Sequence, residues 1–172
     1  WIHSNADSTE LAVEINQIDL QQLSRFAAIP DMQGRVNVAL RYVPSDVSYL
    51  IAADANIDNL IFRGQPVGEL LLNGVYLPLD NNRHRFDAHF YHNESELATV
   101  SAFYRQPQQK QAQGAIDGTM QFDRIPLSEL NPFFGGAVDM QGVLRGRLTL
   151  ESRDRGPIWN GYLQLDSTSM YV

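Results

Sequence analysis

The sequence predicts an all-β protein built from antiparallel strands, and three observations support this prediction. Apolar and polar residues alternate with a period of two along most of the chain, as they do on a strand with one buried face. Short turn signals separate these runs and leave no room for the crossovers of a parallel sheet. One block of sequence occurs twice, at 15–34 and at 122–142, which is typical of extended, repetitive architectures.

Five strands follow directly from the alternation, and their apolar positions run through residues 11–15, 36–42, 86–90, 116–122 and 144–150. Further strands are predicted at 47–54, 57–63, 67–77, 97–104 and 158–165. Turn signals rich in Pro, Gly, Asn and Asp lie at 43–46, 63–66, 80–83 and 154–157. The Gln-rich stretch 106–113 is expected to be a flexible loop between two repeat units.

The block that occurs twice departs from the strand pattern. Its apolar residues recur at intervals of three, which suits one or two helical turns with a single apolar stripe. The residues of the two stripes are Leu20, Leu23 and Phe26, and Leu127, Leu130 and Phe133. Asp19 is a suitable N-cap for the first helix, whereas Pro126 and Pro132 confine the second to a short segment. We expect one continuous β-rich fragment of a larger protein over 1–172, with repeat units at about 9–105 and 114–172.

Composition narrows the function classes. The chain has 172 residues, 13 Lys and Arg against 20 Asp and Glu, and a net charge of −7, so it lacks the basic surface that nucleic-acid binding needs. It has no cysteine, which removes disulfides and thiol chemistry. No nucleophile elbow, phosphate loop or dinucleotide fingerprint occurs. We therefore expect neither an enzyme nor a cofactor.

Three histidines within nine residues raise the question of a metal site. On a strand, His84 and His92 share a face but sit roughly 26 Å apart, whereas His89 points to the opposite face. We therefore expect exposed strand histidines and no metal. The alternative is a site completed by Glu94 or Glu96.

Four stretches resemble one known family: Phe62–Leu72, Asp117–Phe134, Gln141–Leu150 and Gly156–Leu165. The last three look like the conserved C-terminal region of TamB, the translocation and assembly module protein, within the wider AsmA-like group. The first is similar to inter-repeat strands of TamB proteins from Bacteroidetes-like bacteria. The individual motifs are Gly-x-Leu patterns, and the resemblance rests on their order.

The resemblance implies a long β-sheet curled lengthwise into an open trough, a β-taco, with an apolar concave side. Family members are anchored in the inner membrane of Gram-negative bacteria and cross the periplasm. They are implicated in carrying phospholipid to the outer membrane and in assisting outer-membrane protein assembly with a barrel partner, TamA. The expected partners are therefore phospholipid acyl chains and a TamA-like barrel or nascent outer-membrane proteins, and the expected location is the periplasm.

The expected lipid groove combines this trough with the alternating pattern. The candidate lining residues are Val36, Val38, Leu40, Phe86, Phe90, Met120, Phe122, Leu144, Leu148 and Leu150. The two stripes of the repeated block are expected to seat against the apolar face as plugs or gates. Acyl chains gain about 0.8 kcal/mol for each methylene that such a face buries.

Two other functions fit the same patterns. A module without lipid transport would present an exposed sheet edge to nascent outer-membrane strands. A β-sandwich that binds carbohydrate or acts as an adhesin would seal the apolar face in a core, and Trp1 and Trp159 with the seven Tyr would then stack on sugars.

Overall fold

A computed structural model of the chain describes residues 2–4, 10–24, 32–46, 48–80, 82–107, 114–134, 138–153 and 156–171. Trp1, Phe26, the side chain of Leu23, most of the expected loop and half of the last expected turn lie outside this description. None of the described helices is long and apolar enough to cross a membrane.

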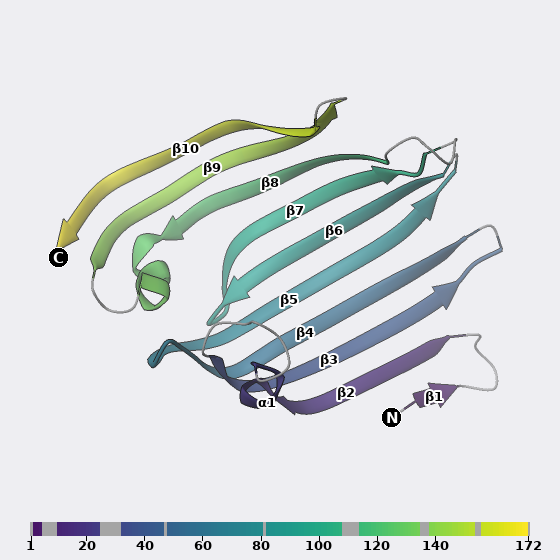
Figure 1. The fold of residues 1–172 in the computed structure, drawn as a ribbon, viewed down its shortest axis with the longest axis horizontal. Helices are drawn as coiled ribbons and strands as arrows, with labels where there is room; N and C mark the ends of the chain where they lie inside the picture. Colours follow the sequence, from purple (N-terminus) through teal and green to yellow (C-terminus); the bar gives the residue numbers. More distant parts are fainter. Residues whose placement is uncertain are drawn as a thin grey trace.

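The described strands form one ten-stranded sheet in which every strand pairs antiparallel with its neighbours in the sequence (Figure 1). The strands are β1 (Ile2–Ser4), β2 (Leu11–Asp19), β3 (Met32–Pro44), β4 (Tyr49–Phe62), β5 (Gln65–Leu79), β6 (Arg83–His92), β7 (Ser95–Arg105), β8 (Ala115–Pro126), β9 (Asp139–Arg153) and β10 (Gly156–Tyr171). Two short helices interrupt the meander: α1 (Leu20–Ser24) and the 3-10 helix η1 (Leu127–Phe134). The prediction of an all-β antiparallel fold with short helices in the repeated block is confirmed.

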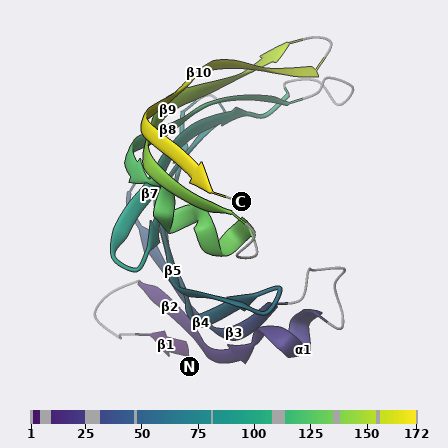
Figure 2. The same ribbon diagram turned by 90° about the vertical axis from the view of Figure 1, so that its left-hand side faces the viewer.

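The sheet curls so that its first and last strands approach the same side, and the molecule has the outline of a letter C when it is viewed along the strands (Figure 2). No second sheet covers the concave side within the described part of the chain. The expected open trough is therefore confirmed, and the closed sandwich is wrong. In this view η1 lies inside the curve and α1 lies at its rim beside β3. Both helices belong to the same end of the trough, because they follow the ends of β8 and β2.

Residues 47–54 and 57–63 were expected to be two strands, and this expectation is wrong. A single strand, β4, runs from Tyr49 to Phe62. Asn59 has a φ of 52°, and the pairing register shifts beside it, so the strand absorbs an extra residue as a β-bulge. A bulge changes the alternation without ending the strand, which is why the pattern suggested a break.

The two copies of the repeated block share their backbone irregularities. Gln17 and Arg124, 107 positions apart, both have positive φ and both lie at a register shift. Gly34 and Gly142, 108 positions apart, also have positive φ, at 141° and 119°. A Cβ atom on either glycine would lie 3.0 Å or less from a carbonyl oxygen of the next strand. The backbone of the two copies is therefore bent at equivalent places.

This equivalence extends one strand beyond the block that the sequence reveals. Asn59 of β4 and Ser167 of β10 both have a φ of 52°. The adjacent carboxylates are also equivalent, because Asp58 accepts a hydrogen bond from Asn56 and Asp166 accepts one from Gln164, each at 2.8 Å. The structure thus relates β2–α1–β3–β4 to β8–η1–β9–β10.

Candidate functional site: the apolar concave face

The concave face of the sheet is built from alternate residues of every strand from β2 to β10. Because directly paired residues of antiparallel strands point to the same face, the register assigns each side chain to one side. Phe86, for example, pairs with Tyr76 on β5 and with Ala102 on β7, and all three point into the curve. The ten candidate groove residues named from the sequence all fall on this same face.

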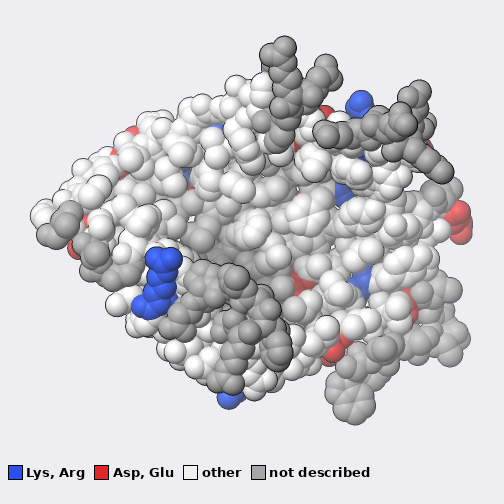
Figure 3. Space-filling model, viewed as in Figure 1, with Lys and Arg blue, Asp and Glu red and all other residues white. Residues whose placement is uncertain are grey.

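Many apolar side chains of this face remain open to solvent. Phe86 is 41% exposed, Ile116 45% and Leu163 57%. In the space-filling view the face is hollowed, and charged side chains are sparse on it (Figure 3). A contiguous exposed apolar surface of this kind marks a binding site in a water-soluble protein. The concave face is therefore the candidate site.

The convex face carries the charged positions of the strands, with a few apolar residues such as Val75 among them, and holds a separate shallow depression of about 790 Å³. Its lining includes Arg85, Asp87, Thr119 and Arg147. Arg85 forms an ion pair with Asp87 at 2.6 Å. Burial alone would raise the pKa of Asp87, but hydrogen bonds from Ser101 and Arg85 outweigh it, and the net shift is downward. These groups satisfy one another, as expected of a solvated polar face.

The helical end of the trough contains the tightest packing. Leu20 of α1 packs with Leu60 and Val67, which are 1% and 4% exposed. Phe133 of η1 packs against this cluster, and its ring centroid lies 6.4 Å from that of Phe62. Leu127 is also buried, and Leu130 is half-buried. Leu20 and Phe133 of the two stripes therefore pack against apolar side chains of the sheet.

A buried histidine joins η1 to the sheet. His92 is 3% exposed, so the expectation that it would be exposed is wrong. Its Nε2 donates to the carbonyl oxygen of Val67 at 2.6 Å, and its Nδ1 contacts Oε2 of Glu129 on η1. Because a bare imidazole nitrogen and a carboxylate oxygen are both acceptors, this contact requires one proton between them. The His92–Glu129 pair is thus a polar tie between the helix and β6.

The other two histidines have different surroundings. His89 is exposed on the convex face and pairs with Glu96 at 2.6 Å, whereas His84 lies half-buried on the concave face. No group of three or more His, Cys, Asp or Glu side chains in the described residues could hold a metal ion. Glu96 therefore serves as a local partner of His89 in this structure.

The end of the trough opposite the helices carries a row of five aromatic rings, one from each strand from β3 to β7. Successive ring centroids lie 5.3, 6.2, 5.7 and 5.8 Å apart. We call this set the aromatic row, and its members are Tyr42, Tyr49, Tyr76, His84 and Tyr104. Burial raises the pKa of Tyr76, and its hydrogen bond with Tyr49 adds to the shift.

Sequence reasoning missed both of these features. The aromatic row draws one ring from each of five strands, so it exists only once the register is known. The His92–Glu129 pair joins residues 37 positions apart, and no local pattern connects them. The only sequence signal for the aromatic row was the presence of Tyr near the ends of several predicted strands. Knowledge of the strand register would have been needed to place these residues side by side.

The fold and the site define a class: a single curled antiparallel sheet whose apolar concave face is open to a ligand. A comparison of the chain with protein-family models, with curated protein sequences and with solved structures finds no match.

Proposed function

We propose that this chain is a non-enzymatic segment of a periplasmic, TamB-like protein and that its trough carries phospholipid between the inner and outer membranes, assists outer-membrane protein assembly, or does both. The observation that supports the proposal is the continuous apolar concave face. A soluble protein that leaves such a face open needs an occupant, and each buried methylene of an acyl chain contributes about 0.8 kcal/mol.

Chemistry on the face also suits lipid movement. Most side chains that line the face are apolar. On β6, for example, the inward-pointing residues are apolar except for His84 and His92. A tail that slides along such a surface exchanges one apolar contact for another, and no strong polar interaction holds it in place. Transport needs this type of weak, distributed contact.

Site-specific photocrosslinking tests the proposal. A photoreactive residue at Val38 or Leu148, on the concave face, is expected to crosslink to phospholipid. The same residue at Ala39 or Thr149, the adjacent positions on the convex face, is expected not to. Native mass spectrometry of the purified protein is expected to show bound phospholipid. Absence of lipid in both measurements, or equal labelling from the two faces, would contradict the proposal.

A second candidate function is strand pairing without lipid transport, and the outer edge of β10 favours it. This 16-residue strand has no neighbour on its outer side within the described residues, whereas its counterpart β4 pairs with β5. An open edge is a template for another strand. Crosslinks from β10 to unfolded outer-membrane protein, together with no lipid in the trough, would favour this candidate.

A further inference from the structure

β10 and β4 are equivalent strands, and each pairs with its inner neighbour in the same register. Tyr42 of β3 lies opposite Ile51 of β4, and Leu150 of β9 lies opposite Trp159 of β10. Both residues of the second pair stand 108 positions after those of the first. The bulge near the end of each strand is equivalent as well. The outer edge of β10 therefore bends at the same places as the outer edge of β4, to which β5 is bound.

The outer edge of β4 shows which kind of strand such an edge accepts. β5 pairs with it antiparallel, and Leu72 and Leu70 of β5 lie opposite Ala55 and Ile57. All four side chains point to the concave face, where directly paired residues cover one another. Ala55 and Ile57 are accordingly half-buried. An edge of this shape is therefore covered by a strand with apolar residues at its inward positions.

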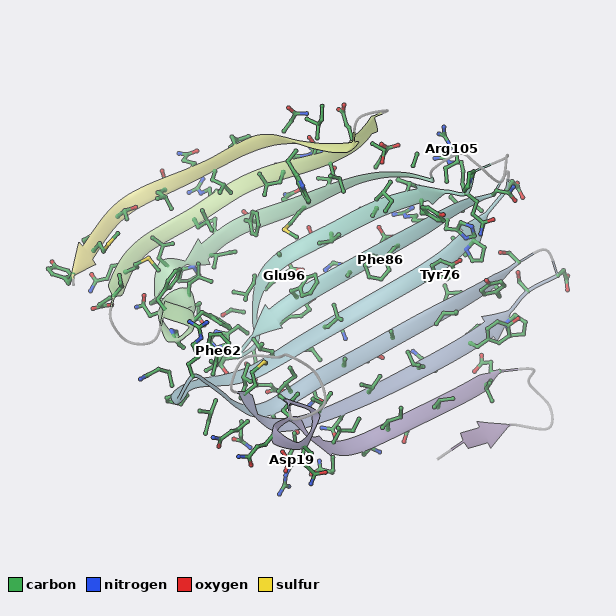
Figure 4. The ribbon with its side chains drawn as sticks, viewed as in Figure 1. Asp19, Phe62, Tyr76, Phe86, Glu96 and Arg105 are labelled. Carbon is green, nitrogen blue, oxygen red and sulfur yellow. The ribbon has the colours of Figure 1, made fainter. Side chains whose placement is uncertain are left out.

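β10 lacks such a cover. Figure 4 shows β10 (yellow) at the margin of the sheet, and no described strand lies beyond it. Leu163 and Leu165 are 57% and 56% exposed, and Trp159 is 58% exposed. The two leucines are the counterparts of Ala55 and Ile57, which β5 covers. A free edge that carries exposed apolar side chains is a template for a strand of another chain.

The opposite face of β10 is mostly polar. Asn160, Gln164 and Asp166 point to the convex side, because they pair with β9 residues of that side. Asp166 also contacts Arg145 at 3.4 Å. A strand that continues the sheet beyond β10 therefore needs apolar side chains toward the concave face and polar ones toward the convex face. Strands of outer-membrane barrels alternate in this way.

We propose that the outer edge of β10 binds an amphipathic, antiparallel strand of an unfolded outer-membrane protein in the register that joins β4 to β5. Apolar residues of the incoming strand then lie opposite Trp159, Leu163 and Leu165 and cover them. This inference rests on the proposed role in outer-membrane protein assembly, and it adds the face pattern and the register of the strand that is bound.

A synthetic peptide with the sequence of β5, residues 65–79, is a suitable probe, because its register on β4 is known. The chain has two tryptophans, so the fluorescence of the Trp1→Phe variant reports on Trp159 alone. The peptide is expected to shift this emission to shorter wavelength in a saturable manner, because strand pairing removes the indole from water. An unchanged emission would overturn the proposal that the edge accepts a strand of this pattern.

Two variant peptides test the face pattern. The peptide L70K/L72K carries its charges on the concave side, and it is expected to bind about tenfold more weakly or worse. The peptide L71K/V75K carries the same added charge on the convex side, and its affinity is expected to stay within about twofold of the parent peptide. Equal weakening by the two peptides would overturn the face pattern.

Disulfide formation tests the register, since the chain has no cysteine of its own. Directly opposed residues of antiparallel strands have Cα atoms about 4.5–5.5 Å apart, which suits a disulfide. Leu163→Cys is expected to react with a Leu72→Cys peptide, and about fivefold less or worse with a Leu71→Cys peptide, whose thiol lies on the other face. Ile15→Cys is the matched control in the protein, because Ile15 is 45% exposed on the same face of β2, near the opposite edge. Equal yields from the two peptides, or from the two protein variants, would overturn the register.

An outer-membrane barrel protein diluted from urea tests the partner. It is expected to lower the disulfide yield of Leu163→Cys with the Leu72→Cys peptide by about fivefold or more, because it occupies the same edge. A disulfide between two Leu163→Cys chains without peptide would assign the edge to a second copy and overturn the proposed partner. No competition, together with photocrosslinks from the barrel protein to other strands, would overturn this inference and leave the assembly role standing. No competition and no crosslink anywhere on the chain would overturn both.

Discussion

The first and second copies of the repeated unit have the same backbone bends but different polar contacts. In the first copy, Asp19 caps α1 by accepting a hydrogen bond from the backbone N–H of Gln21 at 2.8 Å. In the second, Pro126 occupies the equivalent position, and η1 is instead held by the His92–Glu129 pair and by Asn131. The repeat therefore fixes where the chain bends, whereas the neighbouring strands decide how each helix is attached.

The outer strands of the two copies differ even more. β4 lies between β3 and β5, whereas β10 has no outer neighbour among the described strands. Trp159, Leu163 and Leu165 of β10 are 58%, 57% and 56% exposed, and the equivalent residues of β4 are only partly exposed. The apolar face is thus partly covered on β4 and open to solvent on the equivalent strand β10. Coverage depends on the neighbours and not on the strand itself.

Truncation of the equivalent buried leucines is the strongest test of the comparison. Leu20→Ala and Leu127→Ala are each expected to lower the free energy of unfolding by about 2–4 kcal/mol, because both side chains are buried, at 8% and 4% exposure. Urea denaturation measures the loss. Leu11→Ala, at 42% exposure on the same face, is the control and is expected to cost far less. If only one of the two variants lost stability, only that helix would contribute its leucine to the packing of the sheet.

Substitution of the equivalent glycines is expected to have the next largest effect. Gly34→Ala and Gly142→Ala force a side chain into positive φ and against a carbonyl oxygen, which costs about 1–3 kcal/mol. We expect the larger loss at Gly34, because β4 is held on both sides whereas β10 can move away. Gly64→Ala, where φ is 79° but no atom lies within 4 Å, separates the φ strain from the close approach. A larger loss at Gly142 would contradict this account.

A single substitution in η1 tests the contribution of the His92–Glu129 pair. Glu129→Gln installs the residue that stands at position 22 of the first copy, and it removes the charge from the contact with buried His92. We expect a loss of about 1–2 kcal/mol in thermal or urea unfolding. Gln22→Ala, on the exposed side of α1, is expected to change stability by less than about 0.5 kcal/mol. Equal effects would mean that the pair does not hold η1.

The smallest expected difference concerns the equivalent carboxylates. Asp58 is half-buried and accepts hydrogen bonds from Asn37 and Asn56, whereas Asp166 accepts one from Gln164 and contacts Arg145 at 3.4 Å on the edge of the sheet. Asp58→Ala leaves two amides without their acceptor and is expected to cost about 1 kcal/mol. Asp166→Ala is expected to cost less than about 0.5 kcal/mol, since exposed ion pairs contribute little. A chemical-denaturation series on both variants would resolve the difference, and a larger loss in Asp166→Ala would run against it.

Much of the fold was predictable because its signals are local. Alternation with period two identified the strands and the apolar face, and turn residues identified most of the hairpins. Apolar residues at intervals of three, beginning at Leu20 and at Leu127, identified the helices, and both of these side chains are buried. Such features depend on residues a few positions apart, so a linear pattern contains them.

The remaining features depend on contacts between distant strands. The bulge at Asn59 hid the continuity of β4, because an extra residue shifts the alternation without ending the hydrogen-bond ladder. The burial of His92 was missed because its partner Glu129 approaches from a helix 37 positions away. Strand register also assembles the aromatic row from five strands, and no stretch of sequence holds more than a part of it.

The sequence by itself therefore determined an antiparallel sheet with one apolar and one polar face and two short helices from a repeated block. Tertiary structure decided that the apolar face stays open and is concave, that both helices lie at the same end, and that tyrosines and a histidine line the other. Side-chain alternation records which face avoids water, but the curl of the sheet and the strand register arise from the twist, the bulges and the pairing of all the strands together.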